Sequence, residues 1–241
     1  MSIFKSYASA LVNLMVPRLC PVCHVALDYD ETLVCRDCRE HAPVTGFCRD
    51  AWNPMVERLE AFLPVYRAAA LLWYNDGGRW RRIIHHFKYE DKWYMARLAG
   101  EWLGEALDES ELFADVDKVI PVPLHWRKRI SRGYNQSEYI AAGVASVLGA
   151  EADFRSVRRK VNNPSQTLNS AMQRWNNVEG IFEVRNPDAL RGRHILLVDD
   201  VFTTGATVVS CADTILRSTG IENVKISVAT FAVARKLVDI L

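Results

Sequence analysis

An apolar run that leads into two acidic residues limits the possible folds of this chain more than any other feature. Residues 195–198 are all apolar and have β-branched residues at both ends, which predicts a strand buried on both faces, as in a parallel sheet. Asp199 and Asp200 follow this run directly. A turn with three threonines around one glycine comes next, and apolar residues then recur at helical spacing as far as Gly220, a predicted C-cap. The stretch therefore predicts a strand, a turn and a helix, which together form half of a βαβ unit.

The predicted turn is suited to binding a phosphate group. The first N–H groups of a helix lack intrahelical partners and carry partial positive charge. Gly205 allows a positive φ, and three side chains add hydroxyl donors: Thr203, Thr204 and Thr207. The lysine and the longer glycine loop of a nucleoside-triphosphate P-loop do not occur in this stretch. Because carboxylates repel phosphate, Asp199 and Asp200 predict ligand hydroxyl groups or a divalent cation such as Mg²⁺, and a phosphorylated sugar fits both parts of the site.

The thirteen residues from Ile195 to Thr207 resemble the phosphoribosyl pyrophosphate (PRPP) signature of type I phosphoribosyltransferases. In that family the two acids bind the ribose hydroxyls and the turn binds the 5′-phosphate. The resemblance implies a set of PRPP-binding residues: Asp199, Asp200, Val201, Phe202, Thr203, Thr204, Gly205, Ala206 and Thr207. Phe202 departs from the pattern, since the family usually has an aliphatic residue there. An ordinary strand-to-helix turn with a threonine cap is the alternative interpretation.

Composition and charge limit the class of protein. A chain of 241 residues with 49% hydrophobic content can bury one sizeable core and a small appendage. A formal net charge of +1 argues against a protein that binds nucleic acid or membrane over its whole surface, although cations gather in residues 79–97, 127–132 and 155–160. The segment up to Met15 has a short apolar run broken by polar residues, which predicts a docking helix rather than a signal peptide or a membrane span. We therefore expect a cytoplasmic protein.

Two C-x₂-C pairs predict a metal site near the N-terminus: Cys20, Cys23, Cys35 and Cys38. Two-residue spacing lets both thiolates of a pair face one ion, and four thiolates satisfy tetrahedral Zn²⁺. Because all four positions are occupied by protein, the zinc would be structural rather than catalytic. Redox-active thiols or two disulfides are the competing interpretations. Cys48 lacks a partner two residues away, and Cys211 lies on the apolar face of a predicted helix, so neither belongs to the site.

A second strand is predicted over residues 116–123, and we expect its pairing to fail near Ile120 because Pro121 and Pro123 have no N–H. A cation-rich loop follows this strand. Asn135, with Glu138 three residues later, resembles a capping box and predicts the start of the next helix. In an open α/β sheet, loops at the carboxyl ends of strands converge on one crevice. The two loops are therefore predicted to form one site.

The residues of this second loop extend the resemblance. Ile-Pro-Val-Pro-Leu-His over residues 120–125 and Arg-Gly-Tyr-Asn-Gln-Ser over residues 132–137 resemble the ComF family, phosphoribosyltransferase-like proteins associated with DNA uptake in competent bacteria. The resemblance extends over nearly the whole chain, from the cysteine pairs to the PRPP turn. It adds four residues to the implied PRPP site: Pro121, Val122, Pro123 and Leu124. It also implies Mg²⁺ bound together with PRPP.

The polar segment from Arg158 to Phe182 is long for a connection inside a compact domain, which is typical of lids and disordered segments. By resemblance it matches the mobile loop that closes over PRPP. The departure of pyrophosphate from the ribose requires charge stabilisation and exclusion of water. The resemblance implies that three cations assist the leaving group: Arg132, Arg158 and Arg174. Ala171 and Met172 stand where the family commonly has an arginine.

The region between the cysteines and the second strand predicts a strand over residues 68–74 and helices over residues 79–89 and 95–106. Residues 79–89 mix cations with aromatics, a mixture that can bind single-stranded nucleic acid or form an ordinary amphipathic helix. His85 and His86 are adjacent and diverge on a helix, so a metal site there is disfavoured.

The sequence thus predicts an α/β protein with the type I phosphoribosyltransferase fold, an open and mostly parallel sheet flanked by helices, and a small zinc-ribbon-like module. We expect residues 1–52 to form an N-terminal helix and the Cys₄ zinc module, and residues 53–241 to form the phosphoribosyltransferase domain. We expect a phosphoribosyltransferase that binds PRPP and releases pyrophosphate to an acceptor. The alternative is a non-catalytic PRPP-binding or nucleotide-binding adaptor in DNA uptake, with single-stranded DNA or a helicase as partner. A structural domain without a ligand would leave Asp199 and Asp200 unexplained. The acceptor and the oligomeric state stay open.

Overall fold

The computed structural model describes residues 17–75, 77–89, 92–124, 129–130, 133–160 and 180–235. Its centre is a five-stranded sheet in which all neighbouring strands are parallel. In spatial order the strands are β1 (Arg67–Tyr74), β7 (Lys225–Ala234), β6 (His194–Phe202), β2 (Lys118–Pro121) and β3 (Glu151–Ala152). The fully buried run at residues 195–198 lies in β6, the central strand of the sheet, which has two strands on each side. The parallel sheet predicted from this run is therefore confirmed.

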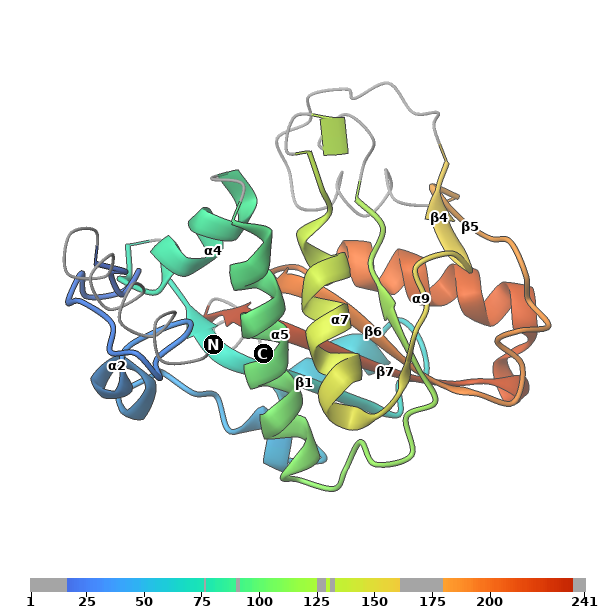
Figure 1. The fold of residues 1–241 in the computed structure, drawn as a ribbon. Coiled ribbons are helices and arrows are strands. Elements are labelled where there is room, and N and C mark those ends of the chain that lie inside the picture. Colours follow the sequence, from blue (N-terminus) through green and yellow to red (C-terminus); the bar gives the residue numbers. More distant parts are fainter. Residues whose placement is uncertain are drawn as a thin grey trace.

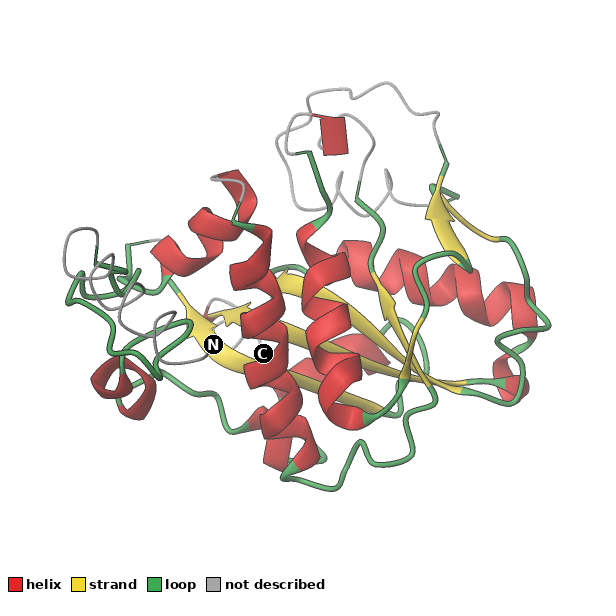
Figure 2. Cartoon of the chain, in the orientation of Figure 1, coloured by secondary structure: helices red, strands yellow, loops and turns green. Residues whose placement is uncertain are grey.

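Helices cover both faces of the sheet, as Figures 1 and 2 show. Alternate residues of β6 divide between two buried clusters, because successive side chains of a strand point to opposite faces. Leu196 and Val198 pack in the cluster that includes side chains of α4 (Arg81–Tyr89), α5 (Trp93–Asp108) and α7 (Gln136–Leu148). Ile195 and Leu197 pack in the cluster that includes α3 (Pro54–Glu60) and α9 (Ala206–Thr219). The carboxyl end of β6 thus lies between two covered faces.

Two glycines allow α5 and α7 to cross at close range in front of the sheet (Figure 1). A Cβ atom on Gly100 would lie 2.1 Å from the carbonyl oxygen of Ile140. A Cβ atom on Gly143 would lie 2.3 Å from the carbonyl oxygen of Arg97. No other residue type fits either position without separating the helices, so this crossing sets the place of the α7 N-terminus.

The N-terminal part, with the short helices α2 (Arg36–Glu40) and η1 (Phe47–Arg49), lies against the outer edge of β1. Val44 bridges Leu72 in the antiparallel sense, and the Trp73 N–H donates to the carbonyl of Pro43 at 2.8 Å. This segment therefore covers the edge strand and satisfies its backbone groups. The division at residues 52 and 53 remains a prediction.

Pairing of β2 with β6 continues further than predicted. The expected failure near Ile120 is wrong on this side, since Pro121 lies opposite Val198 and the Val122 N–H donates to the Val198 carbonyl at 2.9 Å. In a parallel ladder the backbone groups of alternate residues point to opposite neighbours. The backbone groups of Pro121 and Pro123 point in the same direction as those of Val119, towards β3. On that side of β2 the pairing does end at Val119. The missing N–H groups therefore cost no hydrogen bond to β6.

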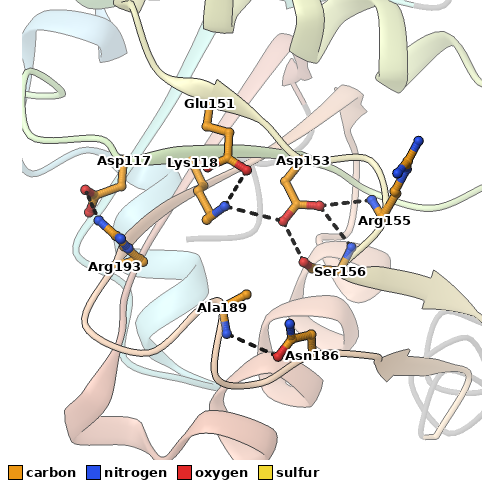
Figure 3. Close-up of polar contacts among 9 residues, drawn as sticks. All are labelled: Asp117, Lys118, Glu151, Asp153, Arg155, Ser156, Asn186, Ala189 and Arg193. Atoms are coloured by element: carbon orange, nitrogen blue, oxygen red, sulfur yellow. Dashed lines mark hydrogen bonds and ion pairs between the residues drawn. The ribbon is translucent and has the colours of Figure 1, made fainter.

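A polar cluster joins the starts of β2 and β3 to the next turn (Figure 3). The Lys118 ammonium, nearly buried, lies 2.6 Å from a Glu151 carboxylate oxygen and 3.8 Å from one of Asp153. Asp153 also accepts hydrogen bonds from two backbone N–H groups and from the Ser156 hydroxyl, and this lowers the pKa of its carboxyl despite burial. The cluster joins the amino ends of β2 and β3 to the turn that follows β3. This turn leads into a two-stranded antiparallel ribbon, β4 (Val157–Arg159) and β5 (Phe182–Val184).

Within the described ranges, no helix has the length and apolar character needed to cross a membrane.

Candidate functional site

Asp199 and Asp200 lie inside β6, near its carboxyl end. The strand extends beyond the apolar run, because Asp199 pairs with Thr230 of β7 and the ladder continues to Phe202. Asp200 is buried, with 5% of its surface exposed, and Asp199 is half-buried. Two adjacent carboxylates are therefore held on a rigid strand rather than on a loop.

Two side chains at the start of α7 bind these carboxylates. The Ser137 hydroxyl donates to Asp199 Oδ1 at 2.8 Å, and the Gln136 amide donates to Asp200 Oδ2 at 2.8 Å. The Asp200 backbone N–H also donates to Asp199 Oδ1, at 2.9 Å. The start of α7, which follows the loop after β2, therefore meets the carboxyl end of β6, as the arrangement of a parallel sheet predicts.

Sequence reasoning did not assign Gln136 and Ser137 to the site, although both stand in the quoted motif at residues 132–137. Their position in the first turn of a predicted helix, after the carboxyl end of a predicted strand, is the signal that could have identified them. Asn135 caps α7 by accepting from the Ser137 N–H at 3.2 Å, which confirms the predicted helix start. Glu138 pairs instead with Arg129 at 3.2 Å.

The turn after β6 has the conformation that its glycine predicts. Gly205 has φ +80° and is the N-cap of α9, a helix of 14 residues. The Phe202 ring lies directly beneath it, because a Cβ atom on Gly205 would come within 2.6 Å of the ring. Phe202, the departure from the family pattern, is buried at 1% exposure and supports the turn from below. Thr203 and Thr207 are exposed, so their hydroxyl groups are accessible to a ligand.

The loop after β2 borders a cavity of about 180 Å³. Its walls include Pro121, Pro123 and Leu124 on one side and Arg158 and Arg159 of β4 on the other. Val122 is buried, and its carbonyl accepts from the Asn135 amide at 3.3 Å. The cavity therefore places guanidinium groups beside this loop.

Of the three cations predicted to assist the leaving group, only Arg158 lies within the described residues. Arg158 forms an ion pair with Glu183 across the ribbon that lowers the pKa of the Glu183 carboxyl. The Cζ atom of Arg159 lies over the Phe182 ring, 5.6 Å from the ring centroid, and burial lowers the pKa of the Arg159 guanidinium. Arg132, Arg174 and most of the predicted lid lie outside the described residues. The same holds for the predicted N-terminal docking helix.

The four cysteines of the two C-x₂-C pairs come together: Cys20, Cys23, Cys35 and Cys38. Their sulfur atoms all lie within 4.8 Å of one another, and Cys23 Sγ and Cys35 Sγ are 3.5 Å apart. Tetrahedral Zn²⁺ with bonds of about 2.3 Å separates its sulfur ligands by about 3.8 Å. Among the residues of the described segments, this is the one cluster of three or more His, Cys, Asp or Glu side chains with the spacing of a metal site. The donor set therefore fits zinc.

The cluster is also electrostatically suited to a cation. Burial opposes ionisation of Cys20, but N–H donors of Cys35, Cys23 and Val22 outweigh it and lower its pKa to about 7. Burial and the neighbouring sulfur atoms raise the pKa values of Cys35 and Cys38. Four thiolates at this spacing repel one another unless a cation lies between them.

The two cysteines left out of the predicted cluster lie elsewhere in the core. Cys48 is buried, its Sγ faces the Ala70 carbonyl at 3.9 Å, and burial raises its pKa to about 12. Cys211 is completely buried on α9, and burial raises its pKa as well. Both cysteines therefore lie in the core, apart from the four-cysteine cluster.

Comparison with known proteins matches this part of the chain to a known domain family and to several relatives. Residues 135–239 match the family model described as the phosphoribosyl transferase domain. The DNA utilization protein YhgH of Shigella flexneri is 36% identical over 102 residues, which is 42% of this chain and 44% of that protein. Competence protein ComFC of Bacillus subtilis (strain 168) is 27% identical over 198 residues, 79% of this chain and 75% of that protein. A solved adenine phosphoribosyltransferase aligns with a TM-score of 0.38 and 13% identity, over 64% of this chain and 76% of that chain.

The alignment with YhgH thus spans less than half the length of that relative. The matched domain contains the α7 start, both carboxylates of β6 and the turn before α9. Together with the all-parallel sheet, the match identifies the predicted type I phosphoribosyltransferase fold.

Proposed function

We propose that the chain binds PRPP with Mg²⁺ at the carboxyl edge of the sheet, because it belongs to the ComF family of phosphoribosyltransferase-like proteins. We further propose that it transfers the phosphoribosyl group to an acceptor and releases pyrophosphate. The observation that carries this proposal is the contact between the start of α7 and the two carboxylates Asp199 and Asp200 near the carboxyl end of β6.

Each part of PRPP has a chemical counterpart in the site. Asp199 and Asp200 are acceptors for the ribose hydroxyls, and Gln136 and Ser137 keep both carboxylates in place. The turn from Thr203 to Thr207 offers hydroxyl donors and the N-terminus of α9 to the 5′-phosphate. The loop over residues 121–124 receives the pyrophosphate end, with cations of β4 nearby.

The chain contributes to the reaction by positioning charges rather than by forming covalent bonds. As the bond to pyrophosphate breaks, positive charge develops on the ribose ring, and buried Asp200 beside Asp199 favours that charge. Guanidinium groups of Arg158 and, by family resemblance, Arg132 and Arg174 favour the departing pyrophosphate. Carboxylate oxygens are ligands that suit Mg²⁺, which would neutralise the pyrophosphate when it is bound.

The first test is calorimetric titration of the full chain with PRPP and Mg²⁺, with ribose 5-phosphate as the control ligand. A pyrophosphate-release assay over a panel of bases and amines follows. Binding with acceptor-dependent release would support the transferase and identify the acceptor class. No binding of PRPP would contradict the proposal.

Two substitutions that keep the side-chain shape but remove the negative charges test the residues themselves. Asp199→Asn with Asp200→Asn should weaken PRPP binding roughly 10²- to 10⁴-fold, because each charged hydrogen bond contributes about 1.5–3 kcal/mol and two are lost. Asp213→Asn is the matched control, since Asp213 pairs with Arg217 on the exposed side of α9. Equal PRPP affinity in the double variant and the control would rule out a binding role for the carboxylates.

Exposed aromatics favour a second candidate, a PRPP-binding adaptor that contacts single-stranded DNA. Trp93 and Tyr94 at the start of α5 are 46% and 49% exposed, and Trp93 stacks near Tyr139 of α7 at 5.3 Å. Aromatic platforms beside cations bind single strands by stacking. PRPP binding without pyrophosphate release, combined with oligonucleotide binding lost in Trp93→Ala, would favour the adaptor over the transferase.

The cysteine cluster is proposed to bind a structural zinc ion. All four ligand positions come from the chain, which leaves no open position for catalysis. Zinc content of the purified protein, measured by atomic emission, tests this assignment.

A further inference from the structure

Tyr134 links the loop before α7 to a different part of the molecule. Its side chain is buried, and its hydroxyl donates a hydrogen bond of 2.7 Å to the carbonyl of Phe87. Phe87 lies in the last turn of α4, where carbonyl groups have no intrahelical partner. Tyr134 therefore joins the last turn of α4 to the loop.

The residues that follow Tyr134 lead directly to the carboxylates. Asn135 caps α7 and binds the Val122 carbonyl, and the next two side chains donate to Asp200 and Asp199. Hydrogen bonds weaken steeply when their distance or angle changes. A shift of the Tyr134 backbone would therefore alter both contacts to the carboxylates.

Helix α4 also shares a buried cluster with the cysteine module. Ile84 and Phe87 belong to the same buried cluster as Cys20, Cys35 and Cys38. The Arg82 guanidinium also contacts the imidazole of His24, the residue after Cys23. A continuous path of packed and hydrogen-bonded groups thus runs from the four sulfur atoms through α4 to the carboxylates.

We propose that the cysteine module sets the geometry of the carboxylate site through α4, and that Tyr134 is the positioning residue that makes this connection. A metal ion on the four sulfur atoms fixes the module against α4, and α4 in turn fixes the start of α7. Loss of the ion loosens the start of α7 at a distance. The consequence for PRPP affinity rests on the proposed function, whereas the mechanical connection does not.

The test of Tyr134 uses the full, zinc-loaded chain. Tyr134→Phe keeps the ring and removes the hydroxyl. It should speed amide hydrogen exchange in residues 136–141 and weaken PRPP binding about three- to ten-fold, the effect of one hydrogen bond. Tyr139→Phe is the control, because it removes a hydroxyl from the adjacent ring, which contacts Tyr134 at 5.5 Å. Unchanged exchange in Tyr134→Phe would overturn the role of this residue.

Zinc removal by a chelator tests the module. In the parent chain, faster exchange should appear in residues 17–52 and also in residues 136–141, while in Tyr134→Phe chelation should add little at residues 136–141. Arg82→Ala, which leaves every cysteine intact, should reproduce part of the effect. A change confined to residues 17–52 would overturn the connection. If the parent chain does not bind PRPP, the proposed function fails, and the exchange measurement still decides the connection.

Discussion

His194 lies at the amino end of β6, at the opposite end of the strand from Asp199 and Asp200. Its Nδ1 is 2.8 Å from an Asp115 carboxylate oxygen, and its Nε2 is 2.8 Å from the Ser227 hydroxyl. A carboxylate can only accept, so the neutral ring donates from Nδ1 and accepts from Ser227. These contacts resemble a Ser-His-Asp triad, but Ser227 is completely buried and cannot reach a substrate. The cluster therefore has a structural role.

The burial of His194 predicts how stability depends on pH. Desolvation lowers the pKa of its imidazole below the ordinary value of 6.5, and the opposing effect of Asp115 does not cancel this. The unfolded chain then binds more protons, so this contribution to stability is fully present above pH 6.5 and is lost as the pH falls towards the folded pKa. Urea unfolding at pH 7.5 and pH 5.5 should show a smaller fall in the free energy of unfolding for His194→Gln than for the parent. An equal fall in both proteins would contradict this assignment.

At the scale of secondary-structure elements, the crossing of α5 and α7 determines where the α7 N-terminus meets the sheet. Gly143→Ala should destabilise the fold by about 2 kcal/mol or more, because its Cβ would overlap the Arg97 carbonyl and the helices must separate. Ser146→Ala, at an exposed position on α7, should change stability by less than about 0.5 kcal/mol. Chemical denaturation of both variants checks this, and two equal stabilities would show that the crossing tolerates a methyl group.

At the scale of the whole molecule, the cysteine module and the sheet share one buried cluster. Cys35→Ser should release the zinc and lower the melting temperature of the whole chain by about 10 °C, since the free energy of metal binding contributes to folding. Cys48→Ser is the matched control, because Cys48 is a buried cysteine of the same region that faces Ala70. Metal analysis and thermal unfolding check both variants. Full zinc content in Cys35→Ser would contradict the assignment of the ligands.

Much of the architecture could be predicted from local patterns. The buried run at residues 195–198, the positive φ at Gly205 and the helix over residues 206–219 follow from periodicity and from the backbone freedom of glycine. The cysteine spacing likewise predicted the cluster. Strand ends were less predictable: pairing between β6 and its neighbours extends past Asp199 and past Pro121, because the pairing depends on which neighbour each backbone group faces.

The sequence by itself determined the residue types at positions 199–207 and the close spacing of the four cysteines, and these are what the proposed phosphate and zinc sites depend on. The tertiary structure alone decided that Gln136 and Ser137 bind the carboxylates, because those residues lie more than sixty positions away along the chain. It also decided that Tyr134 meets α4, since packing brings Phe87 and Tyr134 together across 47 positions. Short spacing specifies local geometry, whereas contacts between distant segments follow from how the whole sheet and its helices pack.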